Sequence, residues 1–586
     1  MPPDSQTRLT SSLLEQIDKI RKELGEKFPV SSQLRVKIIR TPMFLSVPGG
    51  INTVLLPAQG MAQIVYFLRL SGIDIDQDDL NIKIHFDNRF GNEKEIVEEK
   101  IFYDSGRIIN YVRGEEDPHL QSVLEKCERK TGLSGYDIVM FSIPEDIKNM
   151  TAVMFALAFS RYVKGRYGPV IAAGGFHFSV YPFLRDHNCC IDYIAEGPGE
   201  LAAQKIILAV ENNLDMQTVF KYHYNAPERF IKKCSYIWPI IPSFDGLPID
   251  KYGYKNNRSI EDAPAEINNL IYDFNESGIL ILPFRLMNGC SGSCIFCSEP
   301  GSGIPLEIMD IDDSVSALKA VKEKHNPAGI FFLDNTINIS KKYINKLCDK
   351  ILGAGLNVLW TACARPDNLD RDTLLKMRAA GCIRLIYGME TASPRILEYI
   401  DKKVKVEQIE QTIKWTDEAG IWTGVEIICG FPHEKWEDVE LTADFLKRNQ
   451  KHINMFYCNI LDIRDSSRLF LNPAGYGIKN IQRAFFEGQE EFSNLKMICY
   501  GYDEINGRAW EEIVRHSVKA YKYLKSTVSN PAAAFPPNED THFLFYLYTR
   551  YKTKPEIVKY FYETSGVIGN DIYRNHGVWG EIKGFG

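Results

Sequence analysis

Three cysteines lie within eight residues in the segment NGCSGSCIFCSEP, residues 288–300, of a chain that has 13 cysteines in all. Cys290, Cys294 and Cys297 have the spacing Cys-x3-Cys-x2-Cys. Three thiolates cannot complete a tetrahedral zinc site, and no matching Cys or His pair follows nearby to supply the fourth ligand. On a 4Fe-4S cluster, three thiolates leave one iron open to a small-molecule chelate. The spacing therefore favours an iron-sulfur site over zinc or buried structural thiols.

The cysteine segment follows an apolar run at 278–287 that is typical of a strand, so the cysteines are expected on a loop at its carboxyl end. Five further β-rich runs alternate with helical patterns after it. Each connection is long enough for a right-handed crossover, which predicts a parallel, partial (β/α)6 barrel that is open on one side. The runs span 329–334, 357–365, 382–390, 422–432 and 454–461, and the helices about 310–325, 340–354, 371–380, 393–417 and 435–449.

Polar residues and glycines end several of these runs, at the edge where barrel enzymes place their chemistry. Two carboxylates at strand ends have a cost unless something binds them, so Asp334 and Glu390 are candidate ligand-binding residues. Arg365 precedes a proline and is either the partner of an anionic ligand or part of a surface salt bridge. The candidates at this edge are Asp334, Arg365, Glu390, Gly430 and Pro432.

The first third of the chain also alternates strand and helix signals. This pattern predicts an α/β fold with a doubly wound parallel sheet, Rossmann or flavodoxin-like, whose ligand lies beyond the carboxyl ends of the strands. Glycines at those ends either make tight turns or let a planar or phosphate-bearing ligand approach the backbone. The strands are expected at 35–44, 81–86, 137–143, 169–175 and 191–197, and the helices at 57–72, 149–168 and 199–212. The candidate residues are Ser142, Gly174, Gly175, His177, Glu196, Gly197, Gly199 and Glu200.

The motifs of both regions resemble those of one enzyme family. The segment CSGSCIFC, with Phe296 before the third cysteine, resembles the cysteine motif of radical S-adenosylmethionine (SAM) enzymes. The segments LLPAQGMAQIVYFLRLSGIDI, YDIVMFSI, AAGGFHFSVYP and IDYIAEGPGE resemble, in order, a cobalamin-binding domain that precedes the catalytic domain. The chain is thus similar to the cobalamin-dependent radical SAM family over about 35–215 and 275–465.

The resemblance implies a role for each candidate. The three cysteines would hold three irons of the cluster and leave the fourth to SAM. Asp334 would bind the amino end of the methionine moiety, and Glu390, in a Gly-x-Glu segment, the ribose or amine. Gly430-Phe-Pro432 would lie beside the adenine, and Arg365 would pair with the SAM carboxylate. The glycine-ended strands of the first third would flank the corrinoid and its nucleotide tail.

The Asp-x-His-x-x-Gly loop that carries the lower cobalt ligand in many cobalamin proteins is not found after 35–44. The nearest string starts at Asp117, which is interpreted as a helix cap, with His119 on the surface. Much of the family also lacks this loop, so its absence leaves the lower face of cobalt unassigned without excluding cobalamin.

The activity that the resemblance implies is methyl transfer. A 5′-deoxyadenosyl radical would remove a hydrogen from an unactivated carbon, and methylcobalamin would then donate its methyl group. One alternative is ring contraction or cyclisation with the same cofactors. Another is a methylthiotransferase, which would need a second three-cysteine cluster in the N-terminal domain. The last is a non-enzymatic corrinoid-binding protein, which would not need the three cysteines.

The length, charge and hydropathy of the chain limit the kinds of partner and the number of domains to be expected. The 586 residues carry a net charge of -7 with no basic tract, which argues against a nucleic-acid partner. No run of about 18 apolar residues indicates a membrane segment, so an oxygen-sensitive, cytoplasmic enzyme is expected. Its substrate would be a small molecule, lipid or peptide, and an external donor such as flavodoxin or ferredoxin would supply electrons. The expected domains are a helical extension (1–34), a cobalamin-binding domain (35–215), a connector (216–275), the barrel (276–500) and a small, mostly helical C-terminal domain (501–586).

Overall fold

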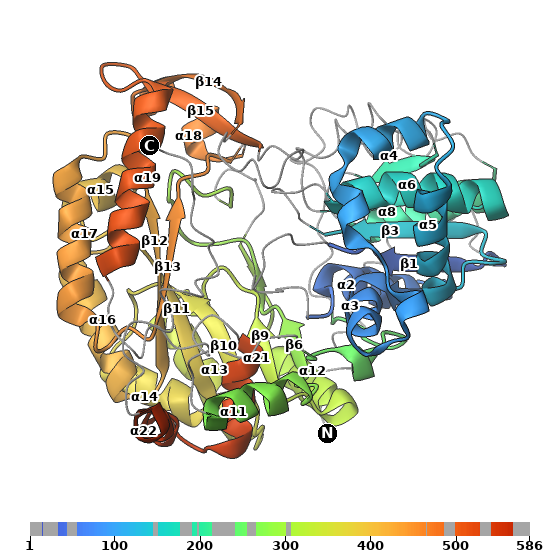
Figure 1. Cartoon of the computed structure of the whole chain (residues 1–586). Coiled ribbons are helices and arrows are strands. Elements are labelled where there is room, and N and C mark those ends of the chain that lie inside the picture. Colours follow the sequence, from blue (N-terminus) through green and yellow to red (C-terminus); the bar gives the residue numbers. More distant parts are fainter. Residues whose placement is uncertain are drawn as a thin grey trace. The chain divides into compact units, whose positions relative to one another are not determined.

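A computed structural model gives the fold (Figure 1). It divides the chain into two compact units, which we call the N-terminal unit, Met1–Asn256 with Phe485–Ile498 and Glu581–Gly586, and the barrel unit, Asn257–Ala484 with Cys499–Gly580. The structure describes Glu15 and residues 33–43, 56–144, 151–175, 190–195, 199–213, 241–254, 265–299, 306–464, 466–485, 498–527 and 541–565.

The N-terminal unit is built on a five-stranded parallel sheet in the order β2-β1-β3-β4-β5. This is the flavodoxin-like order, and it confirms the predicted doubly wound sheet. The strands are β1 (Val36–Arg40), β2 (Ile75–Asp79), β3 (Ile138–Ile143), β4 (Val170–Gly175) and β5 (Tyr193–Ala195). The helices include α2 (Gln59–Leu70), α4 (Ser105–Val112), α5 (Pro118–Thr131), α6 (Thr151–Tyr167) and α8 (Gly199–Glu211). Helix α6 is apolar almost all round because it is buried between the sheet and α4 and α5.

The strand predicted at 81–86 is wrong, because these residues belong to helix α3 (Leu80–Phe90). The alternation of Ile and polar residues there imitates a strand, but Asp79 caps the helix by accepting a hydrogen bond from Ile82 N at 3.1 Å. The strand lies just before it, at β2. Its sequence IDQDD is poor in apolar residues, and the buried Asp79 is tolerated because Arg40 pairs with it at 3.1 Å.

Part of the segment predicted as a connector packs on the N-terminal unit. Ser243 N donates to Ala62 O at 3.0 Å, and the Gln77 amide donates to Ser243 O at 2.7 Å. The buried Tyr252 hydroxyl donates to Asp79 Oδ2 at 2.7 Å. Residues 241–254 are therefore tied to the edge of the sheet formed by β2.

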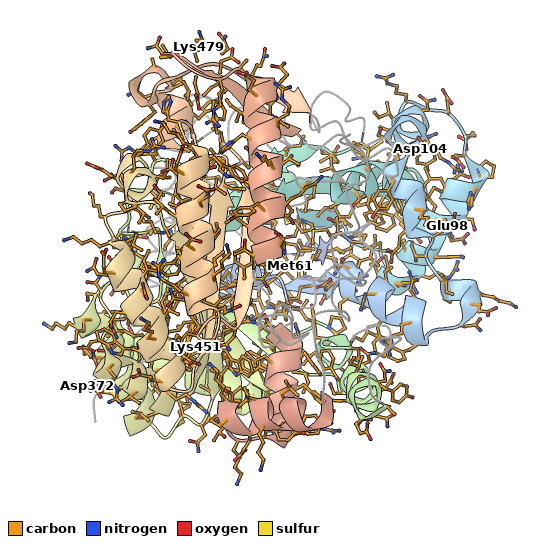
Figure 2. The ribbon with its side chains drawn as sticks, turned by 60° about the vertical axis from the view of Figure 1, so that its left-hand side comes forward. Met61, Glu98, Asp104, Asp372, Lys451 and Lys479 are labelled. Carbon is orange, nitrogen blue, oxygen red and sulfur yellow. The ribbon has the colours of Figure 1, made fainter. Side chains whose placement is uncertain are left out.

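The barrel unit contains a six-stranded parallel sheet in the order β13-β12-β11-β10-β9-β6, which confirms the predicted partial barrel. Its strands are β6 (Ile281–Phe284), β9 (Gly329–Phe332), β10 (Leu359–Ala364), β11 (Cys382–Glu390), β12 (Trp422–Cys429) and β13 (Met455–Ile460). The intervening helices are α12 (Ile311–His325), α13 (Lys341–Gly353), α14 (Arg371–Ala379), α15 (Pro394–Tyr399), α16 (Val406–Glu418) and α17 (Trp436–Asn449). Figures 1 and 2 show α17 beside α19 (Trp510–Thr527), which also packs on β12 and β13.

The C-terminal helices close the amino-terminal end of the barrel. Arg384, near the start of β11, donates to Thr541 Oγ1 of α21 (Thr541–Arg550) at 2.6 Å. Lys554, which begins α22 (Lys554–Ser565), donates to Ile421 O at 3.0 Å and to Asn454 Oδ1 at 2.8 Å. The helical C-terminus is thus confirmed, and the unit also holds a two-stranded sheet of β14 (Ile478–Phe485) and β15 (Ile498–Glu504). None of the helices described here has the length and hydropathy needed to cross a bilayer.

Candidate active site

The cysteine loop follows β6 and is anchored to the rest of the barrel unit. A short strand, β7 (Met287–Asn288), leads into it and pairs with β8 (Glu307–Ile308). Ile295 N, between the second and third cysteines, donates to Ile400 O at 3.1 Å, and Leu469 N donates to Ile295 O at 3.0 Å. The Phe296 ring meets the Phe431 ring edge-on at 5.5 Å. The loop is therefore held from the segment after β11 and from the turn after β12.

The three thiols fit an iron-sulfur cluster by their chemistry and their surroundings. Gly292 N donates to Cys290 Sγ at 3.3 Å, and a Cβ added at Gly292 would lie 3.4 Å from Cys290 Sγ and 4.0 Å from Cys294 Sγ. The backbone at Gly292 thus lies next to two of the three sulfurs. Burial raises the pKa of Cys294, and that of Cys297 to about 11, so a bound cation is needed to hold them as thiolates.

A single ion and a cluster place different demands on the cysteines. In the part of the chain that the structure describes, no group of three or more His, Cys, Asp or Glu side chains could hold a metal ion. A cluster makes a different demand, because each thiolate binds its own iron. Thus, Cys290, Cys294 and Cys297 remain a predicted cluster site.

Asp334, two residues after β9, supports the chain that enters the cysteine loop. Its Oδ1 accepts hydrogen bonds from Leu286 N at 2.9 Å and Met287 N at 2.8 Å. Its Oδ2 is buried without a hydrogen bond among the described residues. Burial raises the Asp334 pKa to about 7. The sequence did not reveal this supporting role, and the predicted contact with SAM stays a prediction for the second oxygen.

Glu390, at the end of β11, forms a buried ion pair with Lys402 at 2.6 Å. Only 8% of the Glu390 side chain and 7% of the Lys402 side chain are exposed. Burial alone would lower the Lys402 pKa, but the Glu390 charge raises it above the ordinary value. The pair sits over Gly388, where an added Cβ would lie 2.7 Å from Glu390 Oε1 and 3.0 Å from Lys402 Nζ. Sequence reasoning missed both Lys402 and the need for this glycine.

Arg365 lies at the same edge. Its Nε donates to Asp367 Oδ1 at 2.9 Å, so the salt bridge kept open from the sequence does exist, but only 13% of the arginine side chain is exposed. One Nη donates to Lys402 O at 2.6 Å. The other Nη lies 3.4 Å from the Cβ position of Gly292. Arg365 therefore joins the end of β10 to the segment after α15 and lies beside the cysteine loop, and its pairing with SAM stays a prediction.

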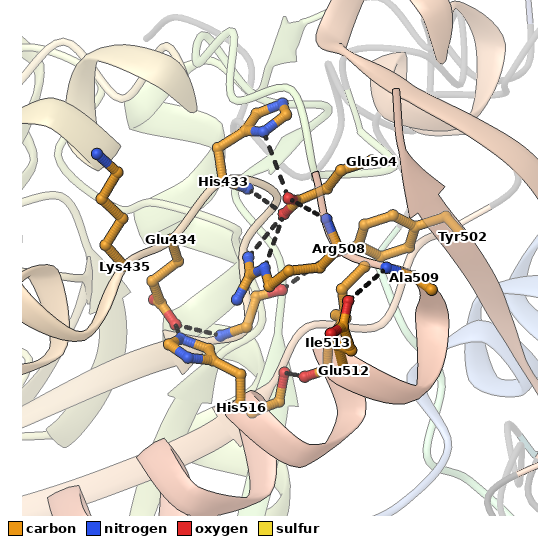
Figure 3. Close-up of polar contacts among 12 residues, drawn as sticks. His433, Glu434, Lys435, Tyr502, Glu504, Arg508, Ala509, Glu512, Ile513 and His516 are labelled. Atoms are coloured by element: carbon orange, nitrogen blue, oxygen red, sulfur yellow. Dashed lines mark hydrogen bonds and ion pairs between the residues drawn. The ribbon is translucent and has the colours of Figure 1, made fainter. Parts of the chain in front are cut away.

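The turn after β12 is held by residues from far along the chain (Figure 3). Gly430 has φ 83°, and its N–H donates to Glu434 Oε2 at 2.8 Å. The Tyr502 hydroxyl donates to Gly430 O at 3.0 Å, and His516 Nε2 lies 3.0 Å from Glu434 Oε2. Pro432 lies between these anchors. The contacts from β15 and α19 were not predicted, because nothing in the local sequence marks them.

A second set of contacts holds the residues that follow this turn. The buried Glu504 carboxylate accepts a hydrogen bond from His433 N at 2.7 Å. It also accepts one from an Nη of Arg508 at 2.6 Å (Figure 3). The Gly430–Glu434 segment is thus fixed on both sides by β15 and the chain that follows it.

In the N-terminal unit the structure brings together some of the candidate residues. Ser142 pairs with Gly174 across β3 and β4, and Ser142 O accepts a hydrogen bond from Thr41 N at 3.0 Å, beyond β1. Gly199 begins α8, where an added Cβ would lie 2.4 Å from Ile64 Cδ1. Gly175 ends β4 and Glu200 lies in the first turn of α8. The candidates His177, Glu196 and Gly197 lie outside the described residues.

Asp117 and His119 have the roles expected of them. Asp117 caps α5 by accepting a hydrogen bond from Leu120 N at 2.9 Å. His119 is exposed and lies 2.9 Å from Glu98, which Figure 2 labels on the surface of the N-terminal unit. Neither observation suggests a cobalt ligand here.

A comparison with family models matches residues 284–446 to the radical SAM superfamily. The chain carries a radical SAM domain. That domain includes the three cysteines, and it spans β9 to β12 and most of α17. The match confirms the resemblance that the cysteine spacing indicated.

Curated relatives of the chain match it in part. An uncharacterized methyltransferase of Pyrococcus horikoshii is 28% identical over 288 residues, 47% of this chain and 58% of that protein. The anaerobic magnesium-protoporphyrin IX monomethyl ester cyclase of Cereibacter sphaeroides is 26% identical over 188 residues, 31% of each chain. The chain therefore spans less than two thirds of the length of either relative.

A solved structure shares the fold over most of the chain around the radical SAM domain. It is the radical SAM methyltransferase TsrM of Kitasatospora setae with cobalamin and a 4Fe-4S cluster bound. The TM-score is 0.53 at 15% identity, and the match covers 85% of this chain and 89% of that one. The likeness confirms the order of a flavodoxin-like sheet, a radical SAM barrel and a helical C-terminus.

Proposed function

We propose that the protein is a cobalamin-dependent radical SAM enzyme that transfers a methyl group to an unactivated carbon. The observation that carries this proposal is the three-cysteine loop at the carboxyl end of β6, inside a radical SAM domain and downstream of a flavodoxin-like sheet. The TsrM structure, which has cobalamin and a cluster bound, shares this fold. The methyltransferase of Pyrococcus horikoshii supports transfer chemistry.

The cofactors supply the chemistry, and the chain positions them. When bound, a 4Fe-4S cluster with SAM supplies hydrogen-atom abstraction, and cobalamin supplies the methyl group. Cys290, Cys294 and Cys297 would hold the cluster. Asp334 keeps the entry to their loop in place through two backbone N–H groups. The start of the cysteine loop is therefore in place before the cluster binds, which reduces the reorganisation that binding requires.

The Glu390–Lys402 pair would bind the zwitterionic end of SAM. Both groups are buried, so each charge is available only to a ligand that enters the barrel and replaces part of their mutual contact. Lys402 Nζ would meet the carboxylate and Glu390 the ammonium group or a ribose hydroxyl. Arg365 holds Lys402 from behind through its backbone carbonyl. The turn at Gly430–Pro432 would receive the adenine.

The carboxyl edge of the N-terminal sheet would receive the corrinoid. Gly174 and Gly175 end β4 beside Ser142, so backbone rather than side chains forms this edge. A large planar ligand can approach such an edge closely. The substrate would be a small molecule, lipid or peptide, and a flavodoxin or ferredoxin would provide electrons.

Anaerobic reconstitution tests the proposal. The protein is produced with a cobalamin supply, desalted, and examined for its ultraviolet-visible spectrum, corrinoid content and iron content. Near one corrinoid and about four irons per chain would support the two-cofactor enzyme. Four irons without corrinoid would remove methyl transfer through cobalt, and corrinoid without iron would leave a corrinoid-binding protein.

A second reaction, a cyclisation with the same cofactors, is favoured by one observation. The match to the anaerobic magnesium-protoporphyrin IX monomethyl ester cyclase includes part of this chain. Product mass distinguishes the two reactions, because methyl transfer adds one methylene to the substrate whereas cyclisation removes hydrogen or gives an isomer.

A further inference from the structure

Glu426 is a half-buried acid in the barrel that none of the roles above uses. It lies in β12, where Val425, Ile427 and Cys429 point outward into the core shared with α16 and α17. Because side chains alternate along a strand, Glu426 points the other way, into the barrel interior. Gly424 lies two residues earlier on the same face of β12. A Cβ added there would contact Ile386 and Met455, so this face points toward interior side chains.

Glu426 stands beside the proposed SAM-binding pair. Its neighbour on β11 is Gly388, and its neighbour on β13 is Tyr457. Gly388 has no side chain, and the Glu390 and Lys402 head groups fill the space where one would lie. Only a glycine therefore separates Glu426 from the ion pair, and the three charged groups share one side of the interior.

Glu426 has no partner of its own. Throughout the described part of the chain its carboxyl group makes no hydrogen bond and no ion pair. Burial, together with the nearby Glu390 charge and against the attraction of Lys402, raises its pKa to about 7. Other ionisable groups near it are Cys363 of β10 and Tyr457 of β13. A half-buried carboxyl group without a partner gains most from a ligand that brings a positive charge.

The charges on the ligand and in the interior can be matched group by group. SAM carries a carboxylate, an ammonium group and a sulfonium. Lys402 and Glu390 complement the first two, which leaves one positive charge on the ligand. Glu426 is the unpaired acid next to the pair, whereas Asp334, whose Oδ2 also has no hydrogen bond among the described residues, follows β9. Arg384 also lies on β11, two interior positions before Gly388. It donates hydrogen bonds to Thr361 Oγ1 at 3.2 Å and to Thr541 Oγ1 at 2.6 Å, so its charge is used at the amino end of the barrel.

We propose that Glu426 is the counter-charge for the sulfonium of SAM and thereby selects SAM over S-adenosylhomocysteine (SAH). This inference rests on the proposed function. The two ligands differ by one methyl group and one positive charge, so Glu426 favours the charged cosubstrate and releases the neutral product. The effect is electrostatic, and it requires no direct bond between the carboxylate and sulfur.

The test compares the affinities of SAM and SAH. Both ligands are titrated anaerobically into reconstituted protein with its cluster oxidised, so that no SAM is consumed. Wild type should prefer SAM. Glu426→Gln should bind SAM about tenfold more weakly and SAH with unchanged affinity, because it removes only the charge. Glu390→Gln should weaken both ligands, and Glu440→Gln, on the exposed face of α17, should change neither.

A pH series adds a second readout beside the affinities of the variants at one pH. A group whose pKa is raised by burial is protonated below about pH 7 and charged above it. The preference for SAM over SAH should therefore grow from pH 6 to pH 8. The same series on Glu426→Gln is the reference, because the sulfonium makes the ammonium group of SAM more acidic than that of SAH and Asp334 also has a pKa of about 7. Circular dichroism and iron content show whether each variant is folded and loaded.

The outcomes separate the two proposals. If wild type binds neither ligand and holds no iron, the proposed function fails. Wild type that holds iron and binds SAM supports the proposed function. If its preference for SAM over SAH is then the same at every pH, and Glu426→Gln keeps that preference, the counter-charge role of Glu426 is overturned. Equal weakening of SAM and SAH by Glu426→Gln would also overturn it, because that result indicates a steric role.

Discussion

The carboxyl ends of the two parallel sheets are made of different kinds of residue. In the N-terminal unit β4 ends in Gly174 and Gly175, beside Ser142 and Ile143 at the end of β3, so β4 presents backbone at that edge. In the barrel unit the strand ends carry buried charges, above all the Glu390–Lys402 pair. A backbone edge suits a large ligand recognised by shape, whereas a charged edge orients a small ligand by its ionic groups. Under the proposed function, the same sheet geometry would serve two kinds of recognition.

Removal of one cysteine should have the largest effect on the charged edge. Cys294→Ala leaves two thiolates, so we expect loss of cluster iron and of all SAM-dependent turnover, with corrinoid content unchanged. Iron and corrinoid assays on the reconstituted protein measure both. Cys348→Ala, at a buried thiol on α13, is the matched control and should keep its iron. Unchanged iron in Cys294→Ala would contradict the cluster assignment.

The complementary change at the backbone edge is Gly175→Ala. The added Cβ would lie 2.2 Å from Ile143 O, so the ends of β3 and β4 must separate. We expect corrinoid content to fall several-fold while about four irons per chain remain. Gly174→Ala is the milder change, because its added Cβ would lie at an ordinary contact distance of 3.4 Å from Ala195 O, and it should lower the corrinoid content less. Equal corrinoid in Gly175→Ala and wild type would show that this edge does not bind it.

A smaller change perturbs the ion pair without removing a charge. Gly388→Ala places a Cβ 2.7 Å from Glu390 Oε1 and 3.0 Å from Lys402 Nζ, so the pair must shift. We expect SAM to bind about tenfold more weakly, with normal iron content, because a charged hydrogen bond contributes about 1.5–3 kcal/mol. Calorimetric titration of SAM measures the change. Gly353→Ala, in α13 with nothing within 4 Å of the added Cβ, should bind SAM as wild type does.

The smallest effect is expected at the turn after β12. Tyr502→Phe removes the hydroxyl that donates to Gly430 O at 3.0 Å and leaves the ring in place. One neutral hydrogen bond contributes about 0.5–1.5 kcal/mol, so SAM affinity should fall about two- to tenfold. A fluorescence or calorimetric titration resolves such a change. If the affinity were unaltered, this tyrosine would stabilise the fold without positioning the turn.

The strands of the barrel were predicted within a few residues because each is an apolar run between strong helical patterns. The error at 81–86 arose where Ile and polar residues alternate inside a capped helix, a pattern that two periodicities fit equally well. Local sequence also could not reveal Lys402, because it meets Glu390 only after the chain has passed through α15. Tyr502 reaches Gly430 across 72 residues of sequence for the same reason. Side chains at strand ends were predictable, and their partners from distant segments were not.

The closure of the barrel by its last helices bears on how the protein is made. Lys554, buried against Ile421 O and Asn454, is synthesised roughly a hundred residues after the last barrel strand, which takes about 5–20 s at usual translation rates. During that interval the amino ends of β11 to β13 lack their cover, although the cysteine loop has long left the ribosome. We therefore expect the barrel to reach its full stability only after α22 has been made, and a chain cut before α22 to unfold more readily.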